Sequence, residues 1–181
     1  NQAAQLLKVM LFDYVRDYLG RGDEALITYH DKAKQVRLAD EQQALVTASS
    51  YIDVLPEFLQ HLRAFPKSSA VENRIVWSKI KFGLKPVLAI NHIMIYKTEK
   101  KTGPQILIAS KQIYANHYFD SSLALTAFVN IPGASPGSFL LYENRSRADG
   151  LQGMFGKIKR GIVEDRAVDG LKGILEQSKV N

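Results

Sequence analysis

Five β-rich runs follow one another between residues 74 and 144, and the links between them are short. The runs read RIVWSKIKF, VLAINHIMIY, QILIASKQIYANHYF, SLALTAFVNI and SFLLYEN. The links GLKP, TEKKTGP, DSS and PGASPG carry residues that favour turns. Such links can join antiparallel neighbours, whereas parallel neighbours need a crossover of about a dozen residues or more. The sequence therefore predicts a five-stranded antiparallel meander.

The first 66 residues carry a helical pattern instead. Apolar residues recur at three- and four-residue spacing between positions 6 and 19. Asp23 and Asp40 can each cap a further helix. A fourth helix is expected from about Leu55, with a proline in its first turn.

The end of the chain returns to helical spacing. The apolar residues that keep this spacing are Leu151, Met154, Phe155, Ile158, Ile162, Leu171, Ile174 and Leu175. A helix over 148–176, lying across a curved antiparallel sheet, is the helix-grip arrangement, which often encloses an apolar cavity. We therefore predict an α+β fold with a helical region in 1–66 and a sheet plus C-terminal helix in 74–181. The two regions form one compact domain, or a fragment of a longer chain.

Composition and motifs exclude several functional classes. The net charge is +6, but no nucleic-acid-binding motif accompanies it, so a nucleic-acid partner is not expected. The chain has no cysteine, which excludes disulfides, thiolate zinc sites and cysteine nucleophiles. The histidines, at 30, 61, 92 and 117, lack metal-binding spacing, and no metal or other cofactor is expected. No apolar run reaches the ~20 residues of a membrane span.

Three motifs, WSKIKFGLKP, SKQIYANHYFD and LYENRSRADGL, resemble a family of uncharacterised, exported bacterial proteins. The resemblance covers nearly the whole chain. It implies a periplasmic or secreted location and an upstream segment that adds strands to the same sheet, and it implies no activity. Ile80 stands where that family is expected to carry an acidic residue, so the resemblance assigns no role to this position.

The stretch SKQIYANHYFD holds most of the candidate site residues. By alternation, Lys111 and Tyr114 lie on opposite faces of a strand unless a β-bulge intervenes. We expect Tyr114 to be the buried one, because a buried lysine needs a carboxylate beside it. His117 and Asp120 can meet across the turn, as the beginning of a general base, although an Asx-type turn explains the same aspartate.

The other candidate residues lie outside this stretch. His92 lies in the most apolar run, and it is either a hydrogen-bonded core residue or a polar contact for an apolar ligand. Trp77 is expected to pack in the core. Arg145 and Arg147 can hold a carboxylate or phosphate, or form a salt bridge to an acidic residue of the final helix, which we prefer.

The preferred function is a non-catalytic module that binds an apolar or amphipathic small molecule between the sheet and the C-terminal helix. The candidate ligand-binding residues are Tyr114, His117, His92, Trp77, Lys111, Asp120 and Arg145, and no residue is assigned a catalytic role. One alternative is a hydrolase-type enzyme that uses His117 and Asp120. Another is an envelope scaffold that contacts a membrane surface through the basic segment GMFGKIKRGIV. The sequence predicts no particular oligomeric state.

Overall fold

The computed structural model describes residues 2–31, 34–49, 56–64, 70–82, 85–98, 106–116, 119–131 and 137–148, together with Lys172 and Glu176. The chain divides into two units, residues 1–147 and 148–181. The sheet and the helices that pack on it belong to the first unit, and only Ala148, the last residue of the final strand, falls in the second. In the second unit Lys172 and Glu176 are helical, and the rest of the helix predicted over 148–176 lies outside the described residues.

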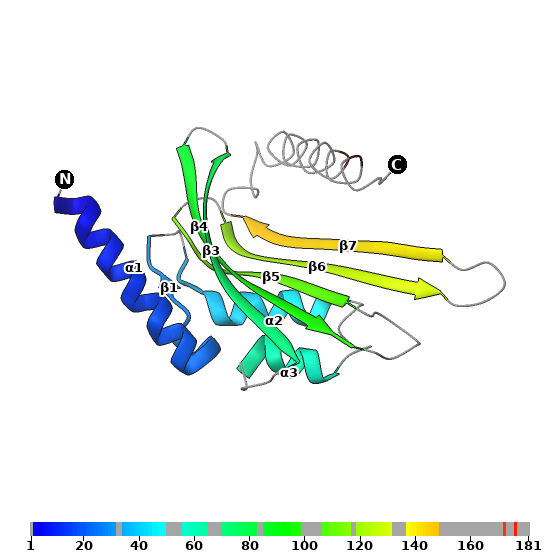
Figure 1. Cartoon of the computed structure of the whole chain (residues 1–181). Helices are drawn as coiled ribbons and strands as arrows, with labels where there is room; N and C mark the ends of the chain where they lie inside the picture. Colours follow the sequence, from blue (N-terminus) through cyan, green and yellow to red (C-terminus); the bar gives the residue numbers. More distant parts are fainter. Residues whose placement is uncertain are drawn as a thin grey trace. The chain divides into compact units, whose positions relative to one another are not determined.

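Five strands form one sheet in the order of the sequence (Figure 1). They are β3 (Val71–Phe82), β4 (Lys85–Lys97), β5 (Ile106–Ala115), β6 (Phe119–Ile131) and β7 (Gly137–Ala148). Neighbouring strands run antiparallel, as the registers of β3 with β4, β4 with β5 and β5 with β6 show. The α+β class and the predicted antiparallel meander are therefore confirmed.

The N-terminal region is helical only in part. Its elements are α1 (Gln2–Arg21), the 3₁₀ helix η1 (Gly22–Ala25), the short paired strands β1 (Thr28–Tyr29) and β2 (Val36–Arg37), α2 (Leu38–Ala48) and α3 (Pro56–Ala64). The helix predicted after Asp23 is wrong, because η1 and β1 occupy that segment. Gly22 adopts a φ of 63°, which glycine tolerates best, and this turn directs the Asp23 carboxylate to the sheet.

The starts of α2 and α3 test two other predictions. Asp40 does not cap α2, which already begins at Leu38 after Arg37. Asp40 lies in the first turn instead, where its carboxylate accepts a hydrogen bond from Arg37. The helix predicted from about Leu55 is confirmed as α3, with Pro56 in its first turn.

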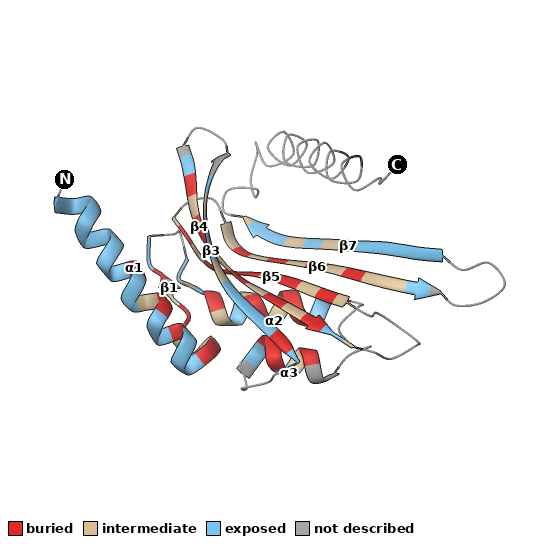
Figure 2. Ribbon diagram, viewed as in Figure 1, coloured by how far each residue is buried: buried red, intermediate tan, exposed pale blue. Residues whose placement is uncertain are grey.

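One face of the sheet packs against the helices, and we call it the helix-covered face (Figures 1 and 2). The core cluster that includes residues of α2 and α3 consists of Leu45, Val46, Phe58, Leu62, Val71, Met94, Tyr96, Leu107, Ala109, Leu123, Leu125 and Ala127. The cluster at α1 consists of Leu11, Val15, Tyr18, Leu26, Tyr29, Leu38, Ile90 and Ile113. In the strands these are mostly alternate residues, as expected for side chains that point to one face.

The residues that alternate with this core form the opposite face of the sheet, which we call the second face. On the three central strands they are Asn91, Ile93, Ile95, Lys97, Ile106, Ile108, Ser110, Gln112, Ala124, Thr126 and Phe128. Most of them are half-buried, and Gln112 is buried.

A β-bulge interrupts the pairing of β4 with β5. The register shifts between Ile90 and Asn91, which leaves Ile113 as the extra residue on β5. Ile113 and Tyr114 both pack in the cluster at α1. The bulge therefore places Tyr114 on the helix-covered face together with Lys111, which strict alternation would have forbidden.

β3 and β7 form the two edges of the sheet, and each is 12 residues long. Among the described strands, none pairs with the outer side of either edge. Both edges are therefore long, and no described strand covers either of them. An exposed edge offers free backbone groups to another strand.

Candidate functional site

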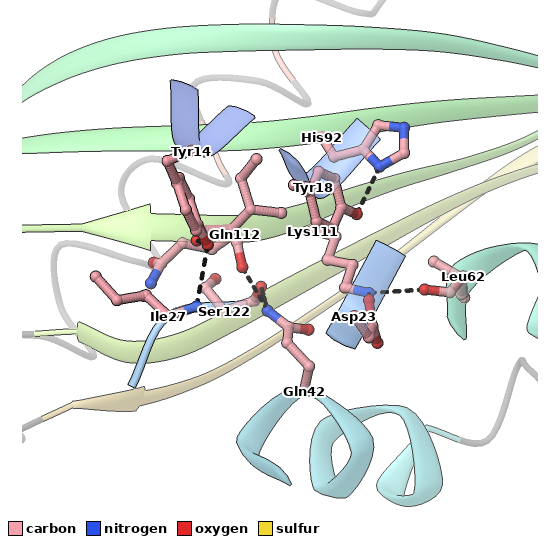
Figure 3. Close-up of polar contacts among 11 residues, drawn as sticks. Tyr14, Tyr18, Asp23, Ile27, Gln42, Leu62, His92, Lys111, Gln112 and Ser122 are labelled. Atoms are coloured by element: carbon pink, nitrogen blue, oxygen red, sulfur yellow. Dashed lines mark hydrogen bonds and ion pairs between the residues drawn. The ribbon is translucent and has the colours of Figure 1, made fainter. Parts of the chain in front are cut away.

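The helix-covered face contains a buried lysine, Lys111, which is only 1% exposed. Its ammonium group donates to the Asp23 carboxylate and, at 2.7 Å, to the backbone carbonyl of Leu62 (Figure 3). The same nitrogen lies 6.0 Å from the centre of the Tyr18 ring. A lysine is rarely buried unless it is paired, and here η1, α3 and α1 each supply one of its contacts.

Lys111 overturns the expectation that Tyr114 is the buried residue of the two. Tyr114 is half-buried, with its ring 6.3 Å from that of Tyr14. Burial lowers the pKa of Lys111 below its ordinary value, and the Asp23 carboxylate opposes that shift. Burial likewise raises the pKa of Asp23, although the neighbouring ammonium lowers it. The pair therefore depends on each partner to keep the other charged.

A second group of polar side chains adjoins Lys111 through its cross-strand neighbour His92. His92 Nδ1 lies 2.9 Å from the Tyr18 hydroxyl, and His92 Nε2 lies 2.9 Å from Asn73 Oδ1. His61 Nε2 lies 3.1 Å from the same oxygen. These contacts link α1, α3, β3 and β4.

The hydrogen bonds of Asn73 determine where the protons of both imidazoles lie. Asn73 Nδ2 donates to the Val71 carbonyl at 3.0 Å, so its Oδ1 is the atom that faces the histidines. Because an amide oxygen only accepts, His61 and His92 must both carry their protons on Nε2. His92 Nδ1 consequently accepts the hydrogen bond of the Tyr18 hydroxyl.

Protonation states follow from the burial of these groups. Burial, assisted by Lys111 and His61, lowers the pKa of His92 to about 3, so this imidazole is neutral in the folded protein. Burial also raises the pKa of Tyr18, which keeps its hydroxyl protonated.

This arrangement holds elements together and occupies the reactive atoms of His92 and Lys111 with contacts inside the fold. A general base needs a lone pair within reach of a substrate proton, and the Nδ1 lone pair of His92 already accepts from Tyr18. The Lys111 ammonium is likewise committed to Asp23 and Leu62. Of the predicted site residues, the structure therefore joins His92 and Lys111 as buried structural contacts.

Two tyrosines satisfy backbone groups at the bulge. The Tyr14 hydroxyl donates to the Ile113 carbonyl and accepts from the Ile27 amide. The Tyr29 hydroxyl accepts from the Ala115 amide at 3.0 Å. Because an extra residue disrupts the ladder, these side chains replace hydrogen bonds that the neighbouring strand would otherwise provide.

A glutamine of α2 does the same on the other side of β5. Gln42 Nε2 donates to the Gln112 carbonyl at 2.7 Å and to the Ser122 carbonyl at 3.1 Å (Figure 3). The pairing of β5 with β6 ends at Lys111 and Leu123. Gln112 and Ser122 are the next residues along the two strands. Gln42 therefore joins α2 to the sheet where the ladder stops.

The second face is apolar in its middle and polar at one end. Ile106 lies between Phe128 and the exposed Lys97, and at the polar end Asn91 pairs with Gln112. Between them, Ile95 pairs with Ile108. The apolar middle of the face thus adjoins the polar pair of Asn91 and Gln112.

Gln112 is the unusual residue of that polar end. It is 3% exposed, yet its Nε2 has no hydrogen-bond partner among the described residues. A buried amide donor without a partner costs about 1–3 kcal/mol, so an acceptor at this position would stabilise the fold.

The other predicted site residues lie apart from one another. Trp77 is 37% exposed at the sheet edge, with its ring 5.5 Å from that of Phe12, so its assignment to the core is wrong. Arg145 pairs with Glu143 on its own strand. Arg147 pairs with Glu41 of α2, 2.6 Å away, and the salt bridge expected with the final helix lies outside the described residues.

The predicted contact between His117 and Asp120 involves a residue outside the described part of the chain. Asp120 is half-buried near the start of β6, and His117 lies outside the described residues. Sequence reasoning missed Asp23, Gln42 and Gln112. A lysine in an apolar strand signals a missing carboxylate, but the chain has 18 acidic residues and the sequence selects none of them.

The described residues contain no group of three or more potential ligands that could hold a metal ion. None of the described helices is both long and apolar enough to cross a membrane. Comparison with family models, curated proteins and solved structures finds no match for this chain.

Proposed function

We propose that this chain is a non-catalytic binding module that holds an amphipathic small molecule against the second face of its sheet. The observation that carries the proposal is the buried Gln112 amide, whose Nε2 has no partner among the described residues at the polar end of an apolar face. The apolar part of the ligand would contact Ile95 and Ile108, and an oxygen at its polar end would accept from Gln112. Pockets for small molecules combine apolar walls with a few such polar groups.

The opposite face supports this location. The helix-covered face is filled by side chains of α1, α2 and α3, and its buried His92 and Lys111 bond to Tyr18 and Asp23. An apolar sheet face needs a second layer to cover it. In the proposed helix-grip arrangement the amphipathic sequence 148–176 supplies that layer, with the ligand between helix and sheet. The resemblance to exported bacterial proteins extends the proposal to a periplasmic or secreted location.

The presence of a bound ligand is tested first, on protein purified under mild conditions. Native mass spectrometry should detect a small molecule that is lost on denaturation, and the amphipathic dye 1-anilinonaphthalene-8-sulfonate should compete with it. The Gln112→Leu variant should retain little of the molecule, because its acceptor atom would face a methyl group. The control Gln43→Leu changes an exposed glutamine of α2 and should retain it fully. A folded chain that neither carries a molecule nor binds the dye would contradict the proposal.

A further inference from the structure

The two edges of the sheet differ in how they are protected against pairing with another strand. The β3 edge carries Glu72, Arg74 and Lys79, and charged side chains discourage association between edges. From Ser138 to Tyr142, the β7 edge carries no charge. β7 is therefore the edge that is open to pairing.

The β7 sequence is unusual for an edge strand. Four consecutive large apolar residues are exposed there: Phe139, Leu140, Leu141 and Tyr142. They point alternately to the two faces, so both faces of the strand are apolar. Continuous apolar runs are typical of strands that have neighbours on both sides and cover on both faces.

α2 covers only the far end of β7. Arg147 bonds to Glu41 at 2.6 Å, and Glu143 accepts from Ser49, directly after the end of α2, also at 2.6 Å. Phe139 and Leu141 lie on the same face as Glu143. They are nearer the N-terminal end of β7, past the end of α2. Figure 2 shows that half of β7 as exposed.

We propose that β7 pairs antiparallel with β7 of a second copy of this chain, with the twofold axis at Leu140. In this register Leu140 lies opposite Leu140, Phe139 opposite Leu141, and Ser138 opposite Tyr142 of the second copy. The apolar side chains then meet one another on both faces of a continuous ten-stranded sheet.

The charged residues of β7 agree with this register, and the small size of the interface predicts a weak dimer. Glu143 lies opposite the uncharged Gly137, and Arg145 and Arg147 fall beyond the paired segment, so no like charges face each other. The shared segment comprises only residues 137–143. The area that it buries is therefore small compared with the roughly 800 Å² per partner of a standard interface. We therefore expect a weak dimer that dissociates on dilution.

The first test is sedimentation over a concentration range of about 1 μM to about 100 μM. The 181-residue chain should shift from monomer to dimer, and Leu140→Lys should stay monomeric because two ammonium groups would meet at the axis. Val76→Lys is the matched control, since Val76 is 43% exposed on the β3 edge and Leu140 is 42% exposed on β7. This control should dimerise like the parent, and circular dichroism should show that all three proteins are folded. A parent that stays monomeric, or dissociation caused by Val76→Lys and not by Leu140→Lys, would overturn the proposal.

The second test uses the absence of cysteine from the chain. Directly opposed residues in an antiparallel pair have Cα atoms about 4.5–5.5 Å apart, within the range that a disulfide spans. Leu140→Cys should therefore form a disulfide-linked dimer under mild oxidation. Ser138→Cys should not, since its two copies would lie about 14 Å apart at the usual rise per residue. Equal cross-linking of both variants, or of neither, would rule out this register.

Discussion

The ammonium group of Lys111 donates to the carboxylate of Asp23, which lies 88 residues earlier in the chain. Lys111 is on β5, in the middle of the sheet, whereas Asp23 belongs to the 3₁₀ turn that ends α1. The Leu62 carbonyl accepts a second hydrogen bond from the same nitrogen, so α3 is tied to the same point. This ion pair links three parts of the fold that are far apart in sequence.

Removal of one partner should cost more than removal of both. Loss of one charge from a buried pair typically costs about 3–5 kcal/mol, whereas replacement of the whole pair by apolar groups is often close to neutral. We expect Asp23→Asn to be the most harmful change, because Lys111 is almost fully buried and cannot recruit water. Lys111→Met should cost less, since Asp23 is partly exposed to solvent. Urea denaturation of both variants and of the double variant gives the coupling energy.

The exposed pair of Arg21 and Asp17 provides the control for that experiment, with its atoms 3.0 Å apart on the surface of α1. Asp17→Asn should change the free energy of unfolding by no more than about 0.5 kcal/mol. A loss for Asp23→Asn that is no larger would show that the buried pair has no special role.

The sequence predicted local features of the fold far better than the contacts between distant residues. Alternation and turn residues identified the five strands, because these signals are carried within each run. The face on which Lys111 lies also follows from alternation. Its burial depends on Asp23, whose side chain was expected to cap a helix. The bulge at Ile113 moved Tyr114 to the same face. No local pattern encodes such a bulge, since the groups that stabilise it come from Tyr14 and Tyr29.

Those two tyrosines give a prediction about the bulge. Tyr14→Phe should remove the hydrogen bonds of the Tyr14 hydroxyl to the Ile113 carbonyl and the Ile27 amide. Tyr29→Phe should remove the hydrogen bond from the Ala115 amide to the Tyr29 hydroxyl. Each change should lower the free energy of unfolding by about 1–3 kcal/mol, the usual cost of a buried polar group left unpaired. Burial raises the pKa of Tyr29 to about 12, so its hydroxyl stays protonated over the range of the assay.

Denaturant titration with hydrogen exchange at the Ala115 amide is the measurement for these variants. Tyr142→Phe is the control, since its hydroxyl accepts only an exposed hydrogen bond from Asn144 among the described contacts. It should alter stability by no more than about 0.5 kcal/mol. Equal effects of Tyr14→Phe and Tyr142→Phe would refute the proposed role of Tyr14 at the bulge.

Gln42 should be similarly sensitive to substitution. Gln42→Met keeps the length of the side chain but removes the donor to the Gln112 and Ser122 carbonyls, and we expect a loss of about 2 kcal/mol. Gln42→Glu should be worse, because a carboxylate would then face two carbonyl oxygens in a buried position. Thermal unfolding of both variants measures this order. Gln43→Met, on the exposed side of α2, should unfold like the parent, and an order in which it is the most harmful would contradict the assignment.

His92 should make the protein less stable as the pH falls. Its pKa is about 3 in the folded protein and 6.5 in the unfolded chain, because burial and the neighbouring Lys111 and His61 disfavour the charged imidazole. Between these values the unfolded state binds more protons, so His92 lowers the free energy of unfolding by up to about 1.4 kcal/mol per pH unit of acidification. Asp23 acts in the opposite direction, since its raised pKa lets the folded state bind a proton first.

The contribution of His92 is isolated by comparing His92→Gln with the parent in urea denaturation between pH 7 and pH 4. The parent should lose stability more steeply than the variant on acidification, because glutamine does not titrate while Asp23 is common to both proteins. Lys111 is also common to both proteins, so the rise of stability with pH that its lowered pKa causes is present in each. His30→Gln removes an exposed histidine after β1 and should keep the steeper slope of the parent. Parallel slopes for His92→Gln and the parent would show that His92 is not held neutral by the fold.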